Sequence, residues 1–160
     1  MMIPKALADS LSTLFGELVD GPPGTVCFVL NPGDIGLLRS LDKLSADAAS
    51  QSTHGGATIA AHVDHLRYGL SLLNRWSRGE NPWADADWTQ SWRISKVSEA
   101  EWRQLRADLG SEIRNWARAL GEPRDMDETE LNGVIASVAH LAYHLGAIRQ
   151  IDRAARGPSA

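Results

Sequence analysis

Apolar residues recur every three or four positions along most of the chain, which is the spacing of an amphipathic helix. Four long segments show this pattern, at 7–18, 59–76, 102–120 and 131–151. Turns rich in glycine and proline separate the first from the second and the third from the fourth. No alternation of strands with helices supports an α/β fold. The pattern therefore predicts an all-α protein, and four long helices favour a four-helix bundle.

Polar residues mark where three of these helices begin. Thr58 is a good N-cap, because its side chain can accept a hydrogen bond from the first turn. Ser98 and Glu101 have the spacing of a capping box. Asp127 or Thr129 begins the last helix.

The links between the predicted helices carry their own signals. Residues 25–30 are β-like but have no partner strand, so we expect an apolar loop there, followed by a short helix over 37–44 and another turn at 45–49. The link at 81–92 is long enough to be a crossover and is rich in tryptophan and aspartate. Because tryptophan buries a large apolar surface, this link is expected to pack down, either into the core or as a lid or pocket wall.

Length and charge restrict the number of domains and the kinds of partner that we expect. The 160 residues suit one domain, 1–160, with a frayed tail at 155–160. The net charge of -4 argues against nucleic acid or an anionic membrane surface as partner, since both select basic patches. No run approaches about 18 consecutive apolar residues and the start lacks a signal-peptide pattern, so we expect no membrane span and a cytoplasmic location. The single cysteine, Cys27, is expected to be a buried, inert thiol rather than a nucleophile.

The distribution of the histidines is the unusual chemistry of this sequence. Four of the five lie on two predicted helices, as His62 and His65 on one and His140 and His144 on the other, while His54 lies in a polar loop and is expected to be solvated. Residues three or four apart share a helix face. Two charged histidine pairs facing each other would repel, whereas a shared metal ion binds neutral imidazole. The alternative is that the histidines are core or rim residues bonded to polar neighbours.

Three histidines and one open position form a catalytic type of metal site rather than a closed structural one. The segment 140–144 lacks the glutamate of the metalloprotease HExxH motif, and the sequence shows no nucleophile elbow and no phosphate-binding loop. His62 is a candidate extra ligand or catalytic group. Tyr143 is a second catalytic candidate. It is close in sequence to the candidate histidine ligands, as are Asp64 and Tyr68, and each of these three residues either supports a ligand or lies at the surface.

Two segments carry a resemblance to a known family. Thr58 lies seven residues before His65, and residues 140–150 read HLAYHLGAIRQ. Together with the spacing of about 75 residues between His65 and His140, these features resemble the DinB-like superfamily, including the YfiT-type metal-dependent hydrolases. The resemblance covers most of the chain. One departure is Ala147, where many members have glutamine.

The resemblance implies an up-and-down four-helix bundle, often a homodimer. It implies a divalent metal ion, such as zinc, nickel or manganese, with His65, His140 and His144 as ligands. Characterised relatives include mycothiol-dependent maleylpyruvate isomerase and bacillithiol transferases, in which the metal is thought to bind a low-molecular-weight thiol. The DNA-damage inducibility behind the family name does not imply DNA binding.

The expected function is therefore that of a metal-dependent enzyme acting on a small molecule, as a thiol transferase or a hydrolase. Zinc or nickel is the expected cofactor, with manganese as a further option. Two other functions stay open: a metal- or ligand-binding module without catalysis, and a dimeric helical scaffold with a vestigial site.

Overall fold

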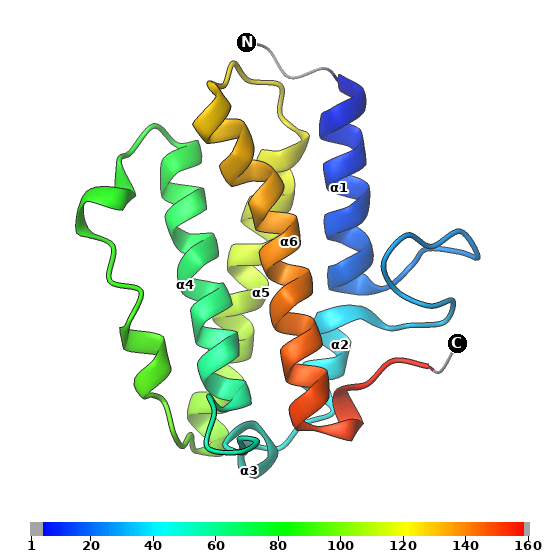
Figure 1. Ribbon diagram of the computed structural model, residues 1–160, viewed down its shortest axis with the longest axis vertical. Helices are drawn as coiled ribbons and strands as arrows, with labels where there is room; N and C mark the ends of the chain where they lie inside the picture. Colours follow the sequence, from blue (N-terminus) through cyan, green and yellow to red (C-terminus); the bar gives the residue numbers. More distant parts are fainter. Residues whose placement is uncertain (1–4, 159–160) are drawn as a thin grey trace.

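The computed structural model describes residues 5–158, and within that range every regular element is a helix (Figure 1). The four long helices are α1 (Lys5–Asp20), α4 (Ile59–Ser77), α5 (Glu99–Gly121) and α6 (Glu128–Ile151). Two shorter α-helices, α2 (Gly36–Asp42) and α3 (Ala46–Ala49), lie in the first link. Three short 3-10 helices are η1 (Pro82–Asp85), η2 (Gln90–Arg93) and η3 (Arg153–Ala155). The predicted all-helical class is confirmed, and residues 25–30 form a loop as expected.

The predicted helix starts are present. Ser98 and Glu101 form the expected capping box at the start of α5. A second capping box begins α6: the Asp127 carboxylate accepts the Glu130 N–H at 2.8 Å, and the Glu130 carboxylate accepts the Asp127 N–H at 2.9 Å. Asp127 rather than Thr129 is thus the N-cap of α6, since it satisfies backbone donors that the helix itself leaves free.

The long helices pack as a four-helix bundle in which α4 and α1 each contact both α5 and α6. α4 and α5 run in the same direction, because residues 78–98 return along the length of the bundle (Figure 1). The contacts agree: Thr58 at the start of α4 bonds Ile94 just before α5, and Asn74 near its end bonds Glu112. The strict up-and-down order implied by the resemblance is therefore not observed. A link this long can span the bundle and leave two consecutive helices parallel.

The core fixes how each helix is rotated about its axis. The two largest fully buried side chains are tryptophans, and each indole N–H has a partner: Trp102 donates to the Leu44 carbonyl at 2.8 Å, and Trp116 donates to the Ser137 hydroxyl at 3.0 Å. Apolar side chains from all four long helices fill the space around them, including Phe15, Leu66, Ile113, Leu141 and Ile148. With its apolar stripe held inward, the histidine face of α6 turns toward α4.

The loop at 25–30 exposes more apolar surface than the sequence suggests. The buried Glu17 carboxylate accepts backbone N–H groups from three successive residues at 2.7–3.1 Å, which turns the backbone inward and the side chains outward. Cys27 is consequently half-buried rather than buried, which corrects the expectation. Partial burial and the negative charge of Glu17 raise the pKa of the Cys27 thiol, which disfavours the reactive thiolate. The exposed apolar side chains here are Val26, Phe28 and Val29.

The C-terminal segment packs against the bundle as far as Pro158. Ala155 has no exposed surface, and the Asn31 amide donates to the Pro158 carbonyl at 3.0 Å. An apolar contact and a long-range hydrogen bond thus place Ala155 and Pro158 against the bundle, and the expected fraying of the tail stays a prediction. Residues 159–160 lie outside the described range.

Helix α6 is long and apolar enough, by length and composition, to cross a membrane, with a mean hydropathy of 1.3 over its most apolar window. Buried residues make up 39% of that window. A core helix of a globular bundle has the same composition, so a membrane is not indicated. A cytoplasmic location and a homodimer stay predictions.

Candidate metal centre

Three of the predicted histidines meet between α4 and α6. His65 Nε2 lies 3.1 Å from His140 Nε2, which in turn lies 2.9 Å from His144 Nε2. One ligand atom from each of the three lies within 4.8 Å of the others. Helices α4 and α6 pack against each other, so a pair four residues apart on one face of α6 lies opposite a single position on α4. This three-histidine group can hold a metal ion.

The spacing and charge of the nitrogens suit a divalent ion. On a tetrahedral zinc ion with Zn–N bonds of about 2.0–2.1 Å, two nitrogens lie roughly 3.3 Å apart, close to the separations of His65 from His140 and of His140 from His144. Burial, followed by the charges of His140 and His62, lowers the pKa of His65 to about 4. Burial and the neighbouring histidines lower the pKa of His144 to about 3, and burial also lowers that of His140. All three are therefore neutral at pH 7, the form that donates a lone pair to a metal.

His62 lies behind His144 rather than beside the three Nε2 atoms. Its Nδ1 is 2.9 Å from His144 Nδ1, the ring nitrogen that does not face His140. A histidine that binds a metal through one nitrogen commonly donates its other N–H to a polar partner, which fixes the ring. His62 therefore has the position of an orienting partner for His144.

The His65 ring is held by stacking. Its Nδ1 is buried, and no residue in the range 5–158 offers it a hydrogen bond. Instead the ring stacks on Trp92, with centroids 4.4 Å apart and planes at 29°, and Trp88 lies 5.6 Å away. The sequence did not predict these contacts. The link has no helix or strand periodicity, so the positions of its tryptophans do not show which residues they contact.

Hydrogen bonds from α4 tie this link over the histidines. The Ser91 hydroxyl donates to the Asp64 carboxylate at 2.6 Å. The Asp87 backbone N–H donates to the Tyr68 hydroxyl at 2.8 Å. Asp64 and Tyr68, which the sequence left as either supporting or surface residues, therefore position the segment that covers the site.

Tyr143, the other catalytic candidate, and His54, which was expected to be solvated, lie outside the cluster. Tyr143 is 71% exposed and touches the His144 ring only edge-on, with centroids 5.0 Å apart. It precedes His144 by one residue, so it points about 100° round the helix. His54 is exposed in the loop before α4, as expected.

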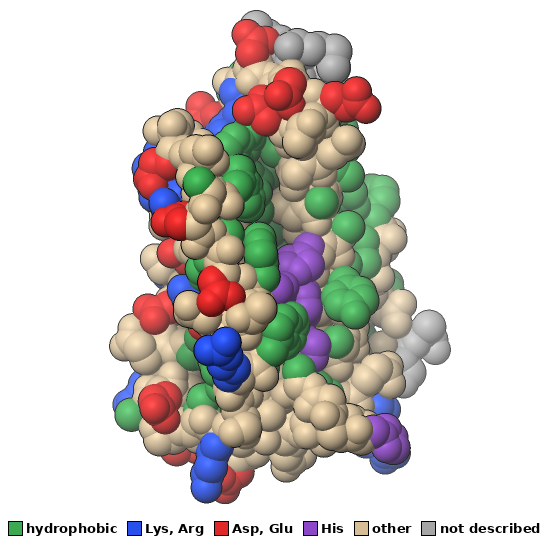
Figure 2. All heavy atoms as spheres, turned by 60° about the vertical axis from the view of Figure 1, so that its left-hand side comes forward, with side chains coloured by type: hydrophobic (Ala, Val, Ile, Leu, Met, Phe, Trp, Pro, Cys, Tyr) green, Lys and Arg blue, Asp and Glu red, His purple; other side chains and the backbone are tan. Residues whose placement is uncertain are grey.

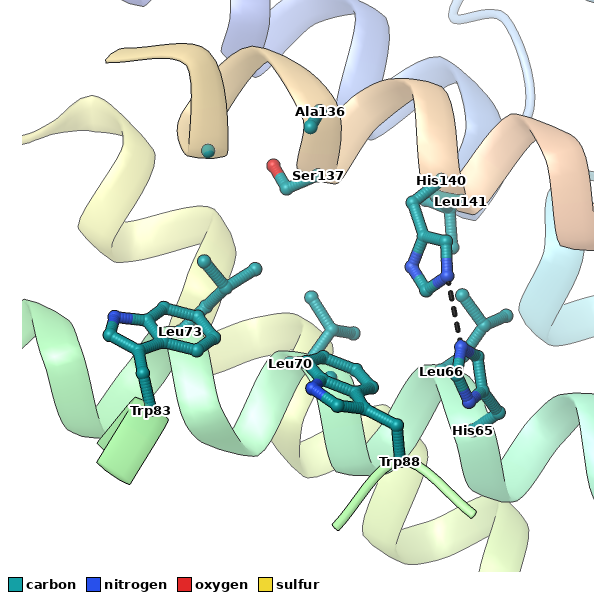
Figure 3. Close-up of a pocket in the computed structure, with 12 residues that line it drawn as sticks. His65, Leu66, Leu70, Leu73, Trp83, Trp88, Ala136, Ser137, His140 and Leu141 are labelled. Carbon is teal, nitrogen blue, oxygen red and sulfur yellow. Dashed lines mark hydrogen bonds between the residues drawn. The ribbon is translucent and has the colours of Figure 1, made fainter. Parts of the chain in front are cut away.

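A cavity of about 350 Å³ adjoins His65 and His140 (Figure 3). Helices α4 and α6 form its two sides, and tryptophans from the link form a wall. On the molecular surface, histidine side chains are visible between hydrophobic ones (Figure 2). The sequence left two roles for the tryptophan-rich link: core packing, or a lid or pocket wall. The three indoles of the link are 40–47% exposed, so the link is better described as a pocket wall. The lining residues other than the two histidines are Leu66, Gly69, Leu70, Leu73, Trp83, Trp88, Gly133, Ala136, Ser137 and Leu141.

Comparisons with protein families, with curated proteins and with solved structures found no match. The resemblance to the DinB-like superfamily stays a prediction, and the fold and the site rest on this chain's own residues.

Proposed function

We propose that this protein is a metal-dependent enzyme that holds one divalent ion on His65, His140 and His144 and activates a small-molecule nucleophile there. The observation that carries the proposal is the convergence of three neutral imidazole nitrogens from two helices. Imidazole ligands suit zinc and nickel, whereas manganese prefers oxygen ligands. Zinc or nickel is accordingly the proposed ion.

A metal ion with an open position lowers the pKa of a bound thiol or water, so that either becomes a nucleophile at neutral pH. The chain's own residues prepare the site for this. His62 holds the His144 ring, Trp92 stacks on His65, and the link shields one side of the cluster. A site whose ligands are held in place in advance loses less entropy when the ion binds.

The lining of the cavity favours a thiol over water. None of the residues that line it is an aspartate or a glutamate, so hydrolysis would lack a carboxylate general base there. A thiolate needs no such base once it has formed, because it is intrinsically a strong nucleophile. We therefore propose thiol transfer ahead of hydrolysis.

The same lack of a carboxylate also suits the second candidate function, a metal- or ligand-binding module without catalysis. The two candidates differ in turnover. Metal-loaded protein should be assayed with 1-chloro-2,4-dinitrobenzene and a panel of cysteine, glutathione and coenzyme A, and separately with 4-nitrophenyl acetate. Thiol-dependent turnover supports the transferase. One bound metal ion with no turnover in either assay supports the binding module.

The metal itself is tested by elemental analysis of tag-free protein. The wild type is compared with a His140→Ala, His144→Ala double variant and with His54→Asn, a control that changes an exposed histidine. His54 has a φ of 53°, a conformation that asparagine tolerates. About one equivalent of zinc or nickel in the wild type and the control, lost in the double variant, is the expected result. A wild type that holds no metal even after reloading overturns the proposal.

A further inference from the structure

We infer that the cavity beside the three-histidine group binds the uncharged, apolar body of a small ligand whose single metal-binding head reaches the ion at His65 and His140. The position of the head rests on the proposed function. The position of the body rests on the shape and chemistry of the cavity.

The size of the cavity sets the size of the ligand. A volume of about 350 Å³ holds roughly a dozen water-sized groups, since a water molecule occupies about 30 Å³ in the liquid. Leucines from α4 and the indoles of Trp83 and Trp88 are among its lining residues, and the two histidines stand at one end (Figure 3). An aromatic ring or a short aliphatic chain fits this space, with its polar end at the histidines.

The polarity of the lining disfavours many polar groups on the part of the ligand that lies inside the cavity. The Ser137 hydroxyl, the only aliphatic hydroxyl among the lining residues, donates to the Val134 carbonyl and accepts from the Trp116 indole, so it is already engaged. None of the lining residues carries a carboxylate, an amide side chain or a charged amine. Sugar hydroxyls or charges placed there would lose their hydrogen bonds to water without replacement. A highly polar thiol could reach the metal only from the solvent side.

Each of the two helices that form the sides of the cavity contributes a glycine to its lining, Gly69 from α4 and Gly133 from α6. A Cβ on Gly69 would meet the Trp88 ring at 3.5 Å and His140 at 3.8 Å. A Cβ on Gly133 would meet nothing within 4 Å. Both positions would therefore accommodate a Cβ, and the absence of a side chain there leaves its volume to the cavity.

The test fills the cavity without touching the histidines. Gly133→Phe and Ala136→Phe each add a ring to its α6 wall, on residues that line it. Gly146→Phe is the matched control, because Gly146 lies on the same helix, is exposed and does not line the cavity. The probes are 4-phenylbutanohydroxamic acid, acetohydroxamic acid with the same head and no body, and 4-phenylbutanamide with the same body and a poor head. Calorimetry gives each affinity, and elemental analysis gives the metal content of each sample.

4-Phenylbutanohydroxamic acid should bind the metal-loaded wild type about tenfold or more tightly than acetohydroxamic acid, because its apolar body moves from water into the cavity. This advantage should disappear in both cavity variants and persist in Gly146→Phe. Equal affinities in the wild type, or an advantage that both cavity variants retain, would overturn the inference while metal binding and the proposed function stand. Conversely, if the protein holds no metal, the proposed function fails. Binding of 4-phenylbutanamide to that metal-free protein, lost in both cavity variants, would still support the cavity as the site of the apolar body.

Discussion

Replacing His62 with phenylalanine should weaken metal binding without abolishing it. The new ring keeps the approximate shape of imidazole but removes the nitrogen that lies 2.9 Å from His144 Nδ1. His144 is only 3% exposed, so water does not readily replace the lost partner. The Nδ1–H of His144 is then left buried and unpaired whenever its Nε2 holds the metal.

The size of the effect follows from the cost of that unpaired group. A buried donor without a partner costs about 1–3 kcal/mol, and each 1.4 kcal/mol is a factor of about ten in affinity. Loss of a partner behind a metal ligand typically lowers affinity about 10–100-fold. The dissociation constant for zinc should therefore rise roughly 10–100-fold in His62→Phe.

The assay is competition for zinc against a chromophoric chelator, with tag-free wild type, His62→Phe, His62→Gln and the control His54→Asn. The glutamine carbonyl can accept the same hydrogen bond, so His62→Gln should keep most of the affinity, and His54→Asn should match the wild type. Complete loss of stoichiometric binding in His62→Phe would mean that His62 is itself a ligand. Unchanged affinity would mean that its contact with His144 does not orient the ring. Either result refutes the role assigned to His62.

Two further predictions concern stability. Arg149→Met should lower the free energy of unfolding, measured by urea denaturation, by about 3–5 kcal/mol, because the buried Asp34 carboxylate loses the two Arg149 N–H groups that donate to it at 2.8 and 2.9 Å. Adding Asp34→Asn should restore part of the loss. An unchanged stability in Arg149→Met would contradict this account. Metal-free protein should lose stability as the pH falls from about 6.5 toward 4, because the unfolded chain protonates His65 at its ordinary pKa of 6.5 whereas the folded chain does so only at about 4. That difference is worth about 3 kcal/mol, fully present above pH 6.5, and urea denaturation should show a shallower pH dependence for His65→Phe than for the wild type.

Local signals in the sequence predicted the four long helices and the candidate metal ligands. The four long helices and the caps at Ser98 and Asp127 follow from periodicity and from hydrogen bonds within a single turn, which neighbouring residues decide. The pairing of His140 with His144 on one face follows in the same way, since a helix brings residues four apart together. That His65 lies opposite them was a prediction from two histidine-bearing faces and a resemblance, and the structure brings the three together.

Contacts between distant segments were decided only in the folded bundle. The sequence shows which face of α6 carries histidines, but the packing of the core determines that this face meets α4. The link's course along the bundle, which makes α4 and α5 parallel, places Trp92 on His65. The role of His62 behind His144 depends on the rotation of two helices whose contacting residues lie 82 positions apart. Periodicity constrains residues within about one turn of each other, whereas these contacts depend on which surfaces the whole chain can bury together.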